Sequence, residues 1–177
     1  MPDLVADDGF ARNAAPAGRF EPHAIERAWH LDRPVGVVWK WLNDPRTFTQ
    51  TQVFPFRVEF IDDGQHDGIM PGTLNAHHGP LMSFHGVVGD VVPPDDDGRN
   101  GYRDLQYAYG SYWLSMRVVR PTRLQFWLDA TGQGQCDLRM RLDSFVRPWI
   151  RGVWTRGNAV FWSRFPKWAM RSTRGDA

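Results

Sequence analysis

The sequence is short of cysteine, of net charge and of long apolar runs. Its one cysteine, Cys136, rules out an internal disulfide and favours a reducing cytoplasm as the location. A formal net charge of only +1 gives no electrostatic reason to expect a nucleic-acid partner. No apolar run reaches the roughly 18 residues needed to span a bilayer. Residues 1–21 lack the pattern of a signal peptide, and we interpret them as a flexible leader.

Motifs for several common chemistries are also missing. The chain has no glycine-rich phosphate loop, no G-x-S-x-G, no H-E-x-x-H and no pair of spaced cysteines. These absences argue against nucleotide-dependent and zinc-hydrolase chemistry, and the sequence predicts no cofactor. Acid–base chemistry stays open, because it needs only a positioned Tyr, His, Asp or Arg.

Aromatic residues are abundant by contrast: nine Trp and eleven Phe. Such side chains bury large areas in a core, and they also line ligand pockets. Both interpretations stay open from composition alone.

The first third of the chain predicts one strand followed by two short helices. Residues 24–31 alternate weakly, as a half-buried strand does. A helix then starts near Pro34 with Asp32 as its cap. Its apolar face carries Val35, Val38, Trp39 and Leu42, with spacings of three and four residues. The helix ends before Pro45, and a second helical turn is expected over residues 46–50.

The middle of the chain predicts antiparallel strands. A strand is expected over residues 53–60, and residues 74–92 read as a hairpin turning at Gly79-Pro80. From residue 101 to 146 we expect a meander with loops at 110–111, 120–122 and 131–135. Those loops predict one continuous apolar row: Leu105, Met116, Phe126 and Met140.

The C-terminal segment, residues 148–173, returns to a helical pattern. Its apolar stripe is Ile150, Val153, Trp154, Gly157, Phe161, Phe165 and Trp168. Pro166 is expected to kink or end the helix. Gly152 and Gly157 each weaken a helix by about 1 kcal/mol relative to Ala, so this helix needs packing to hold it or space beneath it.

This order of elements resembles the START/Bet v 1-like superfamily, also called SRPBCC or helix-grip. The sequence segment on which this resemblance rests is "PVGVVWKWLND", Pro34 to Asp44. The resemblance implies an α+β helix-grip fold over residues 22–174, in which a curved seven-stranded antiparallel sheet wraps around the long C-terminal helix. It also implies a cavity for apolar ligands. A lipocalin-like barrel is the alternative, but it does not usually place a helix between its first two strands.

The residues expected to contact a ligand lie on the inward face of the sheet and on the last helix. The predicted function is binding of a hydrophobic or amphipathic small molecule, such as a lipid or polyketide. One alternative is an aromatase/cyclase- or dehydratase-type enzyme using His77, Tyr107 or Arg27. Another is a regulatory domain whose cavity is filled by its own side chains. The predicted ligand-binding residues are Phe56, Asn75, His77, Phe84, Tyr107, Tyr109, Met116, Phe126, Trp154, Phe161 and Phe165.

Two further readings of the sequence carry less weight. Three histidines in "AHHGPLMSFHG" suggest a metal site, but the expected hairpin places His85 roughly 13 Å along the sheet from the His78 row, too far for one zinc ion. The basic residues between Arg147 and Arg174 flank an aromatic helix, so transient contact with an anionic membrane is a minority prediction.

Overall fold

The computed structural model describes residues 19–50, 57–61, 68–79, 82–109 and 118–173. Most of the predicted leader, together with Phe56 and Met116, lies outside these residues. Among the described helices, none is both long enough and apolar enough to cross a membrane.

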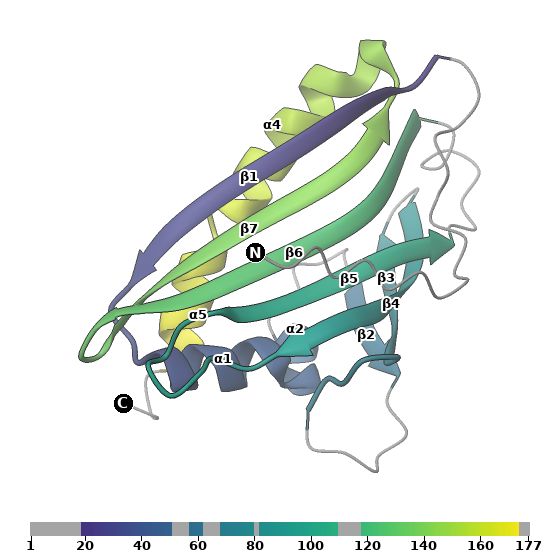
Figure 1. The fold of residues 1–177 in the computed structure, drawn as a ribbon. Helices are drawn as coiled ribbons and strands as arrows, with labels where there is room; N and C mark the ends of the chain where they lie inside the picture. Colours follow the sequence, from purple (N-terminus) through teal and green to yellow (C-terminus); the bar gives the residue numbers. More distant parts are fainter. Residues whose placement is uncertain (1–18, 51–56, 62–67, 80–81, 110–117, 174–177) are drawn as a thin grey trace.

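Seven antiparallel strands form one sheet in the order β1-β7-β6-β5-β4-β3-β2, as the helix-grip expectation requires. Figure 1 shows the long strands β1, β7 and β6 running side by side in front of the C-terminal helix. The strands are β1 (Glu21–Leu31), β2 (Arg57–Ile61), β3 (Leu74–Gly79), β4 (Met82–Val92), β5 (Gly101–Tyr109), β6 (Val119–Gly132) and β7 (Gln135–Val146).

Two short helices follow β1, as predicted: α1 (Val35–Asn43) and α2 (Pro45–Gln50). The predicted cap is wrong, because Pro34 occupies the N-cap position without a side-chain hydrogen bond and the carboxylate of Asp32 instead accepts a hydrogen bond from Gln135. Val38 and Leu42 of the predicted apolar face are fully buried. Trp41, which the predicted stripe omitted, is buried as well.

The predicted meander register is correct between β6 and β7, whereas the predicted loop at residues 110–111 lies outside the described residues. Phe126 faces Met140, Leu128 faces Leu138 and Leu124 faces Leu142 across β6 and β7. The predicted loop at residues 120–122 is wrong, because these residues belong to the continuous strand β6, and Leu105 pairs directly with Leu124 instead of Met116. A register shift between Pro121 and Arg123 explains the error, since an irregular position tolerates a proline that cannot donate to the ladder.

Irregularities also bend β4. The register shifts between His85 and Gly86 and again between Val88 and Val91, and such bulges kink a strand and increase its twist. A Cβ atom built on Gly86 would lie 2.3 Å from the backbone oxygen of Gln106, so only glycine allows β5 to approach this closely. The bend helps the sheet to curve around the C-terminal helix.

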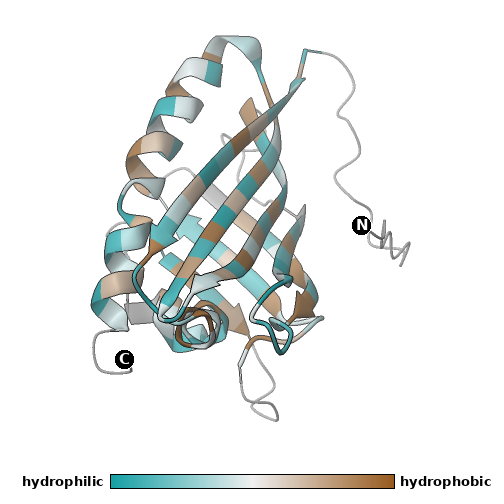
Figure 2. Ribbon diagram, turned by 60° about the vertical axis from the view of Figure 1, so that its left-hand side comes forward, coloured by the Kyte–Doolittle hydropathy of each residue, from teal (hydrophilic) through white to brown (hydrophobic). Residues whose placement is uncertain are grey.

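The C-terminal helix runs in two segments, α4 (Arg151–Trp162) and α5 (Phe165–Ser172), after a single 3-10 turn at Pro148–Ile150. The position of Pro166 predicts this interruption of the helix. In the structure the proline lies in the first turn of α5. Figure 2 shows the helix along one side of the wrapped sheet, whose strands alternate between hydrophilic and hydrophobic residues.

The predicted stripe of this helix is only partly the buried one. Asn158, Trp162, Phe165 and Ala169 are buried, whereas Val153 is 66% and Phe161 37% exposed. The buried residues follow spacings of three and four, so the line of contact with the sheet is rotated from the predicted one. The aromatic core lies under the junction of α4 and α5, where the ring of Phe165 is 5.4 Å from Trp29, 5.3 Å from Trp41 and 5.2 Å from Trp162, measured between centroids.

Candidate functional site

A cavity of about 860 Å³ lies between the concave face of the sheet and α4. Its walls are mainly aromatic and aliphatic, and α1, α2, six of the strands and both segments of the C-terminal helix contribute to them. Such a volume falls in the range of small-molecule pockets. The side chains of the described residues therefore do not fill the cavity, which weighs against the filled-cavity alternative. Lining residues that sequence reasoning did not select include Trp41, Phe48, Phe60, Arg103, Asn158 and Trp162.

Seven of the predicted ligand-binding residues line this cavity together: His77, Phe84, Tyr107, Phe126, Trp154, Phe161 and Phe165. Asn75 is buried but is not among the lining residues, and neither is Arg27. The guanidinium of Arg27 donates to the carbonyl oxygen of the adjacent Glu26. Phe56, Met116 and the side chain of Tyr109 lie outside the described part of the structure.

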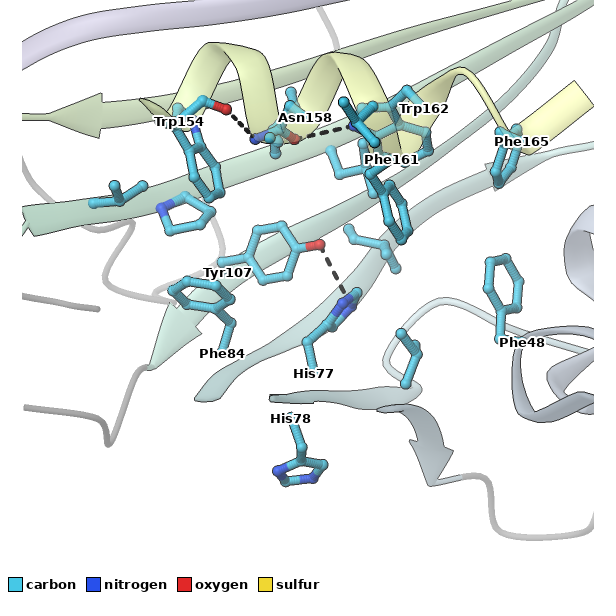
Figure 3. A pocket seen from close by; sticks show the side chains of 18 of the residues that line it. Phe48, His77, His78, Phe84, Tyr107, Trp154, Asn158, Phe161, Trp162 and Phe165 are labelled. Carbon is cyan, nitrogen blue, oxygen red and sulfur yellow. Dashed lines mark hydrogen bonds between the residues drawn. The ribbon is translucent and has the colours of Figure 1, made fainter. Parts of the chain in front are cut away.

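His77 and Tyr107 form a polar contact inside the apolar cavity. The Tyr107 hydroxyl is 3.4 Å from Nε2 of His77, and the rings meet edge to face with centroids 5.4 Å apart. Figure 3 shows the imidazole of His77 turned toward this hydroxyl, with Trp154 and Phe161 entering from α4 on the opposite side. The pair is a polar contact in a mainly apolar wall.

Burial keeps both members of the pair neutral at neutral pH. Loss of hydration lowers the pKa of His77 to about 4, with further lowering by His78, His85 and Arg103. Burial also raises the pKa of Tyr107 above its usual range, an effect that Arg103 partly opposes. The contact is therefore a hydrogen bond between uncharged groups.

The spacing used to argue against a metal site was wrong. His78 faces Ser83, and His85 faces Ala76, one diagonal step away. Their rings lie 5.7 Å apart between centroids rather than roughly 13 Å. His77 nevertheless points to the opposite face, toward Tyr107, as the pleat requires (Figure 3). Within the described residues, no three His, Cys, Asp or Glu side chains could hold a metal ion together.

The cavity face of α4 is held by hydrogen bonds within the helix. The Asn158 amide donates to the Trp154 carbonyl oxygen at 3.0 Å, and its oxygen accepts from Nε1 of Trp162 at 3.1 Å (Figure 3). The Asn158 side chain therefore uses its amide and its oxygen within the helix, and it holds the indole of Trp162. Nε1 of Trp154 is buried and has no partner among the described residues, so it is a donor that a ligand can use.

Arg103 is the lining residue that sequence reasoning missed. It shares the inward face of β5 with Leu105 and Tyr107, because all three have the same parity along the strand. That alternation was a sufficient signal, but a charged residue on an apolar face was not expected. Arg103 is fully buried, and burial lowers its pKa to about 9, so the guanidinium is still protonated at neutral pH.

The single cysteine lies away from this chemistry. Cys136 is buried on β7, as its position on an apolar strand face predicts. Burial raises the pKa of its thiol to about 11. Because the thiolate is the reactive form, this side chain is inert at neutral pH.

Comparisons with known proteins give matches in structure but none in sequence. No family model and no curated protein matches the chain. The aromatase/cyclase ZhuI from Streptomyces sp. R1128 matches with a TM-score of 0.61 at 14% identity, over 89% of this chain and 99% of that one. Ara h 8.0201 matches with a TM-score of 0.58 at 13% identity, over 86% and 98% of the two chains.

A third match is norcoclaurine synthase from Thalictrum flavum, solved in complex with dopamine and hydroxybenzaldehyde. Its TM-score is 0.56 at 13% identity, over 98% of this chain and 93% of that one. At these identities the three structures establish a shared fold and nothing about a shared activity.

Proposed function

Because the chain has the START/Bet v 1-like, or SRPBCC, fold, we propose that it binds a hydrophobic or amphipathic small molecule in the cavity under α4. The observation that carries this proposal is the 860 Å³ cavity, which stays open although the residues around it are large and apolar. A core with the same composition would close such a space, because interiors are packed as tightly as organic crystals.

Apolar burial would supply most of the affinity. A ligand that buries roughly 300 Å² of apolar surface gains about 7 kcal/mol at 25 cal/mol per Å², from which the cost of immobilising the ligand is subtracted. The His77–Tyr107 contact would then fix the ligand's orientation. A lipid chain, a polyketide or a small aromatic compound fits these requirements, and the dopamine and hydroxybenzaldehyde bound to norcoclaurine synthase support the last class.

An acid–base enzyme of the cyclase type is the second candidate, and the His77–Tyr107 hydrogen bond is the observation that favours it. The pKa directions weigh against it. A general base works best when its pKa lies near the working pH, whereas that of His77 is lowered to about 4 and that of Tyr107 is raised. We therefore place binding ahead of catalysis by this pair.

Uptake of the neutral probe N-phenylnaphthylamine tests the proposal. Saturable fluorescence enhancement is expected for the full chain, and native mass spectrometry of the purified protein should reveal any co-purified ligand. Absence of saturable probe uptake would contradict the proposal.

Two glycines of α4 offer a matched pair of variants. A Cβ atom on Gly157 or Gly152 meets nothing within 4 Å, but only Gly157 lines the cavity. Gly157→Leu should lower probe affinity about tenfold by occupying ligand space, whereas Gly152→Leu should leave it unchanged. Equal effects of the two variants would place the probe outside this cavity.

The catalytic alternative has its own test. Turnover of a polyketide-like substrate that disappears in both Tyr107→Phe and His77→Gln, with folding intact by circular dichroism, would favour the enzyme. Unchanged probe binding without turnover would favour the binding protein.

A further inference from the structure

The side chain of Arg103 is a buried cation whose hydrogen-bonding groups are mostly unused. Its Nη1 donates to the carbonyl oxygen of Leu42 at the C-terminal end of α1. Its Nε and Nη2 are buried and have no partner among the described residues. Burying a charged group without hydrogen bonds is costly, and buried polar groups in native proteins nearly always find partners.

Three aromatic rings surround this guanidinium. Its central carbon lies 5.4 Å from the ring centroid of Phe48, 5.8 Å from that of Phe60 and 5.6 Å from that of Phe126. These cation–π contacts offset part of the cost of burial, and they hold the planar group in place. They cannot accept the two remaining N–H donors as an oxygen would.

No acidic side chain compensates the charge from inside the cavity, since no Asp or Glu is among the described lining residues. The neighbouring Asp104 belongs to the opposite face of β5. There its carboxylate is 2.5 Å from Nε of Arg123 and accepts the backbone N–H of Asp90. The cavity wall therefore carries a net positive charge at Arg103, in a place where water is largely excluded and electrostatic attraction is strong.

We infer that the ligand of this cavity is an organic acid, whose carboxylate binds Nε and Nη2 of Arg103 while its apolar body lies under α4. The inference rests on the proposed binding function and specifies its ligand class. Nε and Nη2 lie on one edge of the guanidinium, and that edge matches the two oxygens of a carboxylate in a bidentate pair. An alcohol or hydrocarbon of the same size would leave both donors unpaired.

The capping bond to Leu42 gives Arg103 a structural role as well. A cation near the last carbonyl groups of a helix is favourable, but that role needs only Nη1. It explains neither why the other two donors are buried without an acceptor nor why no Asp or Glu is among the described lining residues. The experiment below separates the two roles.

Matched pairs of ligands test the inference on the unmodified chain. Displacement of N-phenylnaphthylamine near neutral pH is measured for dodecanoic acid against dodecanol, and for anthracenecarboxylic acid against anthracenemethanol. We expect the acid of at least one pair to bind about tenfold more tightly than its alcohol, because hydrogen bonds to a charged group are the strong ones. Equal or weaker binding of both acids overturns the inference.

Variants assign the preference to a residue. Arg103→Met should abolish the preference for the acid, whereas Arg57→Gln should retain it. Arg57 also lines the cavity, but its side chain is 63% exposed and pairs with Glu59 at 2.6 Å. If only Arg57→Gln loses the preference for the acid, the carboxylate binds at the rim of the cavity, and the inference is overturned. If Arg103→Met does not fold, Arg103→Lys, which keeps the charge but not the bidentate edge, should weaken the preference.

A measurement on the ligand needs no variant. Carbon NMR of carboxyl-labelled dodecanoic acid should report a bound carboxylate that is still ionised at mildly acid pH, because a neighbouring guanidinium favours the charged form. A bound acid that is already protonated there would show an apolar site without a cation partner and overturn the inference. Failure of the proposed function is distinguishable, because it appears as no uptake of the neutral probe at all.

Discussion

The two segments of the C-terminal helix cover the same sheet in different ways. α5 packs Phe165 and Ala169 into the core, where they are 4% and 1% exposed, and the Arg33 side chain holds its end through Thr173. α4 leaves Phe161 37% exposed along the cavity wall. The comparison shows that one aromatic-rich helix can expose its cavity-lining ring in one segment and bury it in the next, although both segments contribute to the cavity wall.

Matched phenylalanine truncations give the largest expected difference between the segments. Phe165→Ala should lower the free energy of unfolding by about 3–5 kcal/mol, the usual cost of deleting a buried ring, because Phe165 contacts rings from β1, α1 and α4. Phe161→Ala should cost about 1 kcal/mol or less, in the range of substitutions at accessible positions. Urea denaturation followed by fluorescence measures both values.

Loss of ligand binding should not follow loss of stability across this pair, because both rings line the cavity. Phe161→Ala should reduce probe uptake more than its small effect on stability suggests, since the ring is part of the cavity wall. Equal losses of stability in the two variants would contradict the difference in burial between the two rings.

The cavity side of the molecule also holds a buried titratable group, and this predicts a pH dependence. The pKa of His77 falls from 6.5 in the unfolded chain to about 4 in the folded one. Between these values the unfolded chain binds more protons, so the free energy of unfolding falls as pH falls. The contribution of His77 is complete above 6.5 and is lost progressively toward about 4, by roughly 3 kcal/mol.

His77→Gln should flatten this dependence. Denaturation at a series of pH values in that window compares the variant with the unmodified chain. A slope that is unchanged by the substitution would show that His77 is not desolvated as described. His23, whose pKa is also lowered by burial, contributes in the same direction, so part of the slope should remain in the variant.

Substitutions that enlarge a side chain of the C-terminal helix should have the smallest effects on the free energy of unfolding. Ala169→Leu inserts a larger side chain into the packed segment and should destabilise the protein by about 1–3 kcal/mol. Gly157→Leu should be neutral or should stabilise it by up to about 1 kcal/mol, because leucine is the better helix former and nothing lies within 4 Å of the new Cβ atom. Thermal unfolding measures both, and a destabilising Gly157→Leu would mean that the cavity wall is packed.

Much of the candidate site could be predicted from the parity of strand residues. His77, Phe84, Tyr107 and Phe126 were placed on the inward face by alternation alone, and the structure gathers them around one cavity. Arg103 has the same parity but was passed over because of its charge. Its burial depends on three rings from α2, β2 and β6. No local sequence pattern predicts that these rings come together around it.

Other misses have equally specific causes. Pro121 looked like the centre of a turn, yet it lies at a register shift inside β6. The predicted pairing of β3 with β4 was wrong and placed His78 and His85 too far apart. In the structure they are one diagonal step apart, with their ring centroids separated by 5.7 Å.

The sequence by itself determined the kinds of elements, their order and the faces on which side chains alternate, because these follow from local propensity and from periods of two and 3.6 residues. Only the tertiary structure decided how far the helix stands from the sheet, and therefore which aromatic rings interlock and which enclose a space. That distance depends on contacts between residues more than a hundred positions apart, such as Trp29 with Trp162 and Phe165, and no local rule specifies it.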